Sequence, residues 1–242
     1  MTAVLKQEDY QHHTSGQFNA ELETLRNHML EMGGRVESQL SAAIDAMMKL
    51  DSGEADLVVG RDSEINKMEM AIDEECTTII ARRQPTASDL RLVVAIIKVN
   101  TDLERIGDEA AKVAKQVVRM SEGGVSPSNF IEIRHIGGRV AQMLRQALDA
   151  FARVDVDQAV EVVRCDRDVD REYGSAMRSL VTFMMEDPRD IGSVLNEMWA
   201  LRSLERIGDH ACKIAEHVVY LARGQDIRHG HLEDLVEADE DR

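Results

Sequence analysis

Apolar residues recur every three or four positions along most of this chain of 242 residues. From Phe18 to Leu50 they mark one face of a helix for about nine turns. Five further segments repeat the pattern: Glu54–Arg82, Asp89–Met120, Phe130–Val154, Asp157–Met185 and Pro188–Arg223. The periodicity predicts six long helices. At a rise of 1.5 Å per residue, helices of about 25–33 residues are about 37–50 Å long, so we expect an elongated molecule.

Short breaks separate the predicted helices. Asp51-Ser52-Gly53 interrupts the first, and Asp51 or Ser52 can cap the helix that follows. Pro85 stops the second helix, and Ser88 is a candidate N-cap for the third. Gly224 is placed to end the last helix.

The two halves of the sequence are copies of each other. Met32–Asn66 aligns without gaps on Ile136–Asp170. "LERIGDEAAKVAKQVV", from Leu103, matches "LERIGDHACKIAEHVV", from Leu204, at 11 of 16 positions. Such a tandem duplication of about 100 residues predicts an all-α protein of two tandem antiparallel three-helix bundles with pseudo-twofold symmetry.

The turn residues and charge runs suggest domain boundaries. We expect an N-terminal tail at 1–17, a first repeat at 18–120 and a second repeat at 130–224. The stretch 121–129, "SEGGVSPSN", is the best candidate for a linker. Residues 225–242 form an acidic C-terminal tail ending in "EDLVEADEDR".

Charge and composition narrow the function. The net charge of −16 argues against nucleic acid as a partner and fits cations or a cationic protein surface. Cys76, Cys165 and Cys212 form no CxxC motif, which is typical of reduced thiols in a cytosolic protein. The N-terminus lacks the apolar core of a signal peptide, and no run of about 18 apolar residues occurs. We therefore expect a cytoplasmic protein without membrane insertion.

The repeated "LERIGD" places two carboxylates on one helical face in each half, because residues four apart lie above one another. The second helix of each half offers a matching pair. Facing pairs of this kind hold divalent or trivalent metal ions in carboxylate bundles. The candidate metal ligands are Asp62, Asn66, Glu104 and Asp108 in the first repeat, and Asp166, Asp170, Glu205 and Asp209 in the second.

Simpler interpretations stay open for these residues. Glu104 can pair with Arg105 or Lys112 on a solvated helix face. Gly107 and Gly208, each between Ile and Asp, indicate close approach of either a neighbouring helix or a ligand.

The other candidate groups favour structural roles. We expect His210 to be exposed or to support the site rather than bind metal, since the first repeat has Glu109 there. Gly33-Gly34 and Gly137-Gly138 favour close helix crossings over a phosphate site, because no GxGxxG pattern occurs. Core positions are expected for Cys76 and Cys212.

Three stretches resemble the PhoU family: "ARRQPTASDLRLVVAIIKVNTDLERIGD", "SLERIGDHACKIAEHVVYLARG" and "MGGRVESQLSAAIDAM". The resemblance covers Phe18 to Gly224 and implies a six-helix fold with E/DxxxD motifs on the inner helices. It also implies metal ions there, as multinuclear Fe or Zn clusters or as Mg or Mn. Asn66 departs from the motif by replacing an acid, so we expect the first-repeat site to bind metal more weakly.

The resemblance further implies a non-enzymatic negative regulator of phosphate uptake and phosphate-starvation signalling. Such a protein acts as an adaptor between the ATPase of the phosphate ABC transporter and a membrane sensor histidine kinase. A carboxylate-bridged metalloenzyme is the alternative, although the Glu-x-x-His pairs of di-iron bundles are absent from the sequence. A scaffold whose carboxylates form only salt bridges is a third interpretation. A homodimer is compatible with all three.

Overall fold

The computed structural model describes residues 16–123 and 130–224 and contains six long helices. They are α1 (Gly16–Lys49), α2 (Ser52–Arg83), α3 (Ala87–Glu122), α4 (Ile131–Arg153), α5 (Val156–Glu186) and α6 (Ile191–Arg223), with a 3₁₀ turn, η2, at Pro188–Asp190. No strand occurs in these ranges, and none of their helices is long and apolar enough to cross a membrane. Most of the predicted tails and linker lies outside the described residues.

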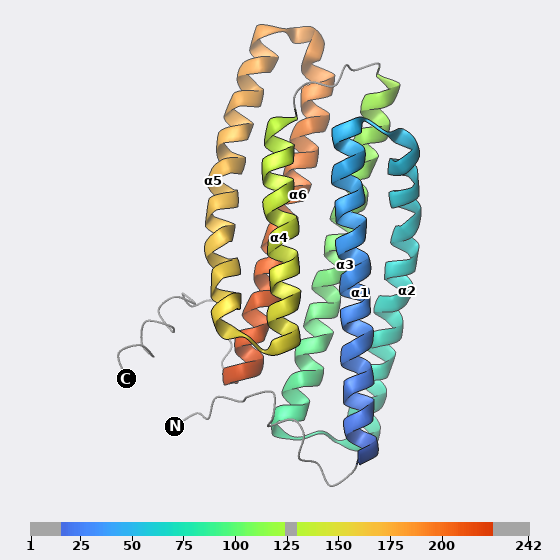
Figure 1. The fold of residues 1–242 in the computed structure, drawn as a ribbon. Helices are drawn as coiled ribbons and strands as arrows, with labels where there is room; N and C mark the ends of the chain where they lie inside the picture. Colours follow the sequence, from blue (N-terminus) through green and yellow to red (C-terminus); the bar gives the residue numbers. More distant parts are fainter. Residues whose placement is uncertain (1–15, 124–129, 225–242) are drawn as a thin grey trace, which may run out of the picture.

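The helices form two three-helix bundles side by side, α1–α3 and α4–α6 (Figure 1). Within each bundle, successive helices run antiparallel (Figure 1). α3 and α6 pack along each other at the centre, and α1 also contacts α4. The prediction of two antiparallel three-helix bundles is confirmed, and the helix ends lie within three residues of the predicted ones.

The turns follow from local capping. Asp51 Oδ1 accepts a hydrogen bond from the backbone N–H of Glu54 at 3.0 Å, and Asp155 caps α5 in the same way. Gly224 ends α6 with φ of +70°, a conformation that favours glycine. The N-cap prediction for Ser88 is wrong: α3 starts at Ala87, two residues earlier than predicted, and Thr86 is its extended N-cap.

Glycines allow α1 and α4 to cross closely. A Cβ atom on Gly33 would lie 2.7 Å from Leu148 Cδ2, and one on Gly137 would lie 3.2 Å from Ile44 Cδ1. Both crossing glycines come from the same place in the two repeats, as the duplication predicts. The adjacent Gly34 and Gly138 have open space around them.

The second bundle is less complete than the first at one end. α1 has 34 residues, whereas α4 has 23. The hairpin of α5 and α6 therefore extends beyond the start of α4 (Figure 1).

Candidate functional site

The first carboxylate cluster lies where α2 faces α3. Burial and the nearby charge of Asp108 raise the pKa of Asp62 above its usual range. Burial and Asp108 likewise raise the pKa of Glu104, with smaller contributions from Glu69 and Asp62. The two helices thus bring the predicted pairs together. Arg105 meets both carboxylates of its own helix, 3.4 Å from Glu104 and 3.8 Å from Asp108.

The second cluster, between α5 and α6, is more strongly acidic. Burial raises the pKa of Asp166 to about 7, helped by the charges of Asp170, Asp209, Glu205 and Glu216. The pKa values of Glu205 and Asp209 are also raised, first by burial and then by neighbouring carboxylates. A cation placed among these groups would relieve their mutual repulsion.

Glycine lets the facing helices approach within each cluster. A Cβ atom on Gly208 would lie 3.3 Å from Asp166 Oδ1, and one on Gly107 would lie 3.1 Å from Ile65 Cδ1 and 3.7 Å from Asp62 Oδ1. Both glycines therefore face the neighbouring helix of their own bundle. The carboxylate of Asp62 lies beside the close contact in the first cluster, and that of Asp166 lies beside it in the second.

Two charge differences make the second cluster more acidic than the first, and a third opposes them, because Arg202 pairs with Glu205 at 2.8 Å where the first repeat has Thr101. Asn66 in the first repeat corresponds to Asp170 in the second, as the sequence predicts. Sequence reasoning missed the other difference, in which Lys115 corresponds to Glu216. Lys115 lowers the pKa of Asp62, whereas Glu216 raises that of Asp166. Both residues lie within the aligned stretches that begin at Leu103 and Leu204, so the mismatch of Lys with Glu there was the signal that could have revealed this inversion.

Both carboxylate clusters contain buried oxygen atoms without a hydrogen-bond partner. Asp62 Oδ1, Asn66 Oδ1 and Glu205 Oε2 are buried without a hydrogen-bond partner. Carboxylate and amide oxygens are ligands for hard cations such as Mg²⁺ and Mn²⁺. As the side chains stand in the described ranges, no three His, Cys, Asp or Glu residues converge into a ligand shell. A cation would therefore require these side chains to rotate toward it.

His210 is buried between the two bundles, so the first alternative of its prediction, an exposed side chain, is wrong. Its side chain is 11% exposed, and Nδ1 lies 2.8 Å from Asp102 Oδ1 on α3. His217, two turns along α6, places Nε2 3.3 Å from Asp102 Oδ2. Burial raises the pKa of Asp102, but the hydrogen bonds with the two histidines outweigh burial and leave the pKa below its usual range. Asp102 and the two histidines thus join α3 to α6.

A second ionic contact joins the bundles. Glu109, which occupies the place of His210 in the first repeat, is 3% exposed. Its Oε1 lies 2.7 Å from Arg206 Nη1 on α6 and 2.9 Å from Lys112 Nζ. Arg206 is therefore engaged across the interface by Glu109, whereas Lys112 pairs with Glu109 within α3.

Cys76 lies in the hydrophobic core, whereas Cys212 lies beside the second carboxylate cluster. Cys76 is fully buried, which confirms the core prediction for it. Cys212 is only partly buried, and burial together with Asp166 and Glu216 raises the pKa of its thiol. The core prediction is therefore wrong for Cys212, which borders the second cluster.

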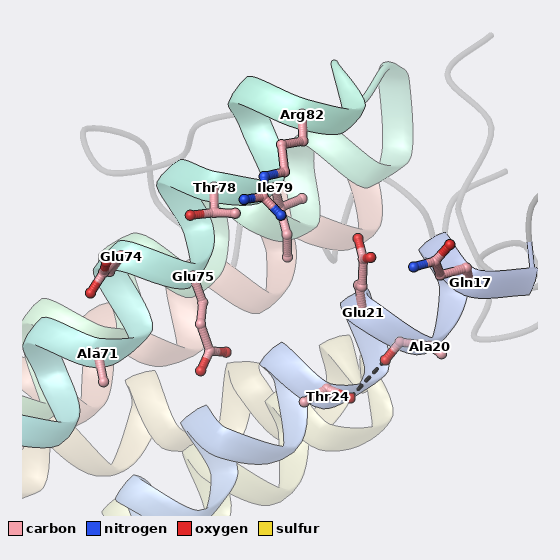
Figure 2. Close-up of a pocket in the computed structure, with 10 residues that line it drawn as sticks. All are labelled: Gln17, Ala20, Glu21, Thr24, Ala71, Glu74, Glu75, Thr78, Ile79 and Arg82. Carbon is pink, nitrogen blue, oxygen red and sulfur yellow. Dashed lines mark hydrogen bonds between the residues drawn. The ribbon is translucent and has the colours of Figure 1, made fainter.

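A separate groove of about 600 Å³ lies at the other end of the first bundle, between the start of α1 and the end of α2 (Figure 2). Glu21 and Thr24 on α1 face Glu75 and Ile79 on α2 across it (Figure 2). None of the predicted metal ligands lines this groove. It marks the place where the first turns of α1 cover the tip of the α2–α3 hairpin.

The fold and the clusters define a class: tandem three-helix repeats with carboxylate pairs on adjoining helices. The PhoU domain family model matches residues 29–117 and 133–218. The chain therefore belongs to the PhoU family.

Known proteins and structures agree with this assignment. The "Phosphate-specific transport system accessory protein PhoU homolog" of Pseudomonas aeruginosa is 57% identical over 226 residues, covering 93% of each chain. The PhoU protein of Escherichia coli is 50% identical over 217 residues, covering 90% of each.

Two crystal structures share the fold. That of PhoU from Pseudomonas aeruginosa is 59% identical, with a TM-score of 0.84, covering 86% of this chain and 100% of that one. The phosphate transport system regulatory protein PhoU from Streptococcus pneumoniae is 30% identical, with a TM-score of 0.80, covering 87% and 99%.

Proposed function

We propose that this protein is a non-enzymatic negative regulator of phosphate uptake and phosphate-starvation signalling. It acts on the cytoplasmic face of the membrane as an adaptor between the ATPase of the phosphate ABC transporter and a sensor histidine kinase. The names of its relatives, accessory and regulatory proteins of phosphate transport, support the coarser part of this role. The net charge of −16 favours protein partners with basic docking faces.

We further propose that the carboxylate clusters bind divalent or trivalent cations. The observation that carries this proposal is the crowding around Asp166, whose pKa burial and four neighbouring carboxylates raise to about 7. Such crowding opposes folding unless a counter-charge offsets it. Asp166, Asp170, Glu205 and Asp209 would hold an ion in the second repeat, and Asp62, Asn66, Glu104 and Asp108 in the first. The bound ion would supply positive charge that ties the two helices of each pair together.

Two measurements test the two proposals separately. Protein purified without chelator should carry at least one equivalent of metal by elemental analysis; less than one contradicts metal binding. The double variant Glu205→Ala, Asp209→Ala should derepress a phosphate-controlled reporter in cells grown with ample phosphate. Unchanged repression by a normally folded double variant contradicts a role for the second cluster in signalling. Asp168→Ala, on the same helix as Asp166, is a matched control that should leave repression intact.

Binding assays test the adaptor role directly. The purified chain should capture the transporter ATPase and the cytoplasmic part of the kinase in pull-down experiments. Capture of neither contradicts the adaptor role, whatever the metal content.

A further inference from the structure

The tip of the α5–α6 hairpin lacks the third helix that covers its counterpart. α4 is eleven residues shorter than α1, which corresponds to about 16 Å of helix. The last turns of α5 and the first turns of α6 therefore stand beyond the start of α4 (Figure 1).

Exposed apolar side chains gather on this hairpin. The described residues include eleven large exposed apolar side chains, and six of them lie between positions 181 and 199. We call these six the bare tip: Val181, Phe183, Met185, Ile191, Leu195 and Trp199, which are 44%, 53%, 80%, 40%, 42% and 61% exposed. Concentrated apolar exposure of this kind is typical of a binding surface.

The first repeat shows what covers the equivalent surface. Counted from the start of its helix, Phe183 on α5 corresponds to Ile79 on α2. Ile79 is only 6% exposed, because the first turns of α1 lie beside it (Figure 2). Phe18 and Leu22 form the buried face of those turns. The cover is therefore an amphipathic helix whose apolar residues lie three or four positions apart.

The last turns of α2 and α5 carry opposite charges. α2 ends in Arg82 and Arg83, and Arg83 pairs with Glu21 of the covering helix at 2.5 Å. α5 instead ends in Glu186, and its C-cap Asp187 pairs with Arg189 of the 3₁₀ turn at 2.6 Å. A helix that covered the second tip would therefore need basic residues where α1 has an acidic one.

A buried acid next to the bare tip also favours a partner with basic residues. Glu197 on α6 is 6% exposed, and no basic side chain in the described ranges pairs with it. Burial and the nearby Glu132 on α4 raise the pKa of Glu197 to about 7. A basic side chain brought in at this end of the bundle would be attracted by both carboxylates.

We propose that the bare tip docks an amphipathic helix of a partner protein, with basic residues along its edge. The helix lies over α5 and α6 as the first three turns of α1 lie over α2 and α3. The inference rests on the proposed adaptor function, and it identifies the surface that holds a partner. An anionic membrane is disfavoured as the occupant because Glu186, at the end of α5, would repel it.

Trp199, the one tryptophan in the chain, provides a direct probe of the bare tip. The ligand is a peptide with the sequence of residues 16–30, carrying Glu21→Lys and Glu23→Lys and held helical by a crosslink on its exposed face. We expect saturable binding to the full chain with a blue shift of Trp199 emission. The unmodified peptide, crosslinked in the same way, should bind at least tenfold more weakly.

Two variants locate the binding surface. Phe183→Asp should weaken binding of the basic peptide at least tenfold, and because Phe183 is 53% exposed the variant should fold normally. Leu57→Asp, at an equally exposed apolar position on α2, should leave binding unchanged. Absence of a saturable shift, equal binding of both peptides, or equal loss in the two variants overturns the proposal.

Other occupants give distinct outcomes. If sedimentation shows a wild-type dimer that Phe183→Asp converts to a monomer, a second copy occupies the tip and the proposal fails. It also fails if vesicles of phosphatidylglycerol and phosphatidylethanolamine shift Trp199 emission. In pull-downs, failure of wild-type protein to capture either transporter ATPase or kinase contradicts the adaptor function alone. Capture of a partner equally by wild type and Phe183→Asp contradicts the docking site alone.

Discussion

The substitution Asp166→Asn should stabilise the metal-free protein, although it removes a predicted ligand. In the folded chain, burial and neighbouring carboxylates raise the pKa of Asp166 from 3.8 to about 7. In the unfolded chain the carboxyl ionises near its ordinary pKa. Asparagine keeps the shape of the side chain without the charge, so the cost of ionising or protonating this group in the fold disappears.

The size of the effect follows from that difference in pKa. A rise to about 7 corresponds to about 4 kcal/mol of lost stability at pH 8. Since the side chain keeps some contact with solvent, screening reduces this to about 2 kcal/mol. In a protein of this size we expect Tm to increase by about 4–8 °C.

The pH dependence has a defined sign. The folded state holds a proton on Asp166 between pH 4 and 7 that the unfolded state releases, so stability of the wild type falls as pH rises through this window. The advantage of Asp166→Asn should be full at pH 8 and vanish near pH 3.

Thermal unfolding followed by circular dichroism in chelator, at pH 8 and at pH 4, measures the change. Asp168→Asn is the matched control: Asp168 lies two residues away, is 43% exposed and pairs with Arg139, so we expect a change within about 0.5 kcal/mol. A lower Tm for Asp166→Asn at pH 8, or a gain of equal size at pH 4, would refute the argument.

The remaining predictions use the same measurement or denaturant titration. Mn²⁺ at a hundred times its Kd should stabilise the wild type by about 2.7 kcal/mol and Asp166→Asn by much less, as calorimetry in metal or chelator can show. Asp102→Asn, which leaves two buried histidines without their carboxylate, should lower the free energy of unfolding in urea by about 2–3 kcal/mol. Gly33→Ala should cost about 1–3 kcal/mol because the new Cβ meets Leu148, whereas Gly34→Ala, with open space around it, should add about 0.5–1 kcal/mol.

Periodicity and duplication were enough to predict the architecture. A spacing of three to four residues sustained over each segment defines a helix whatever its neighbours, and Asp51 and Gly224 mark ends that the structure confirms. The pairing of Glu104 with Asp62 across two helices was also predictable, because short turns force adjacent antiparallel packing.

The interface between the bundles was not predictable in the same way. His210 and His217 lie seven residues apart on one face of α6, but only the packing of α3 on α6 shows that Asp102 meets both. The same packing takes Arg206 away from the neighbouring carboxylates to Glu109. Such contacts depend on how two helices distant in sequence are rotated against each other, which no local pattern specifies.

The duplication supplies an internal control for the second cluster. The first repeat builds the same helix pair with Asn66 and Lys115 where the second has Asp170 and Glu216. Helix packing therefore does not require the extra acids. With Arg202 of the second repeat in the place of Thr101 set against these two differences, the second cluster carries two more negative charges. Because that charge opposes folding around Asp166, a structural role does not account for it. The proposed cation would gain attraction from each added carboxylate, and we expect it to bind the second cluster more tightly than the first.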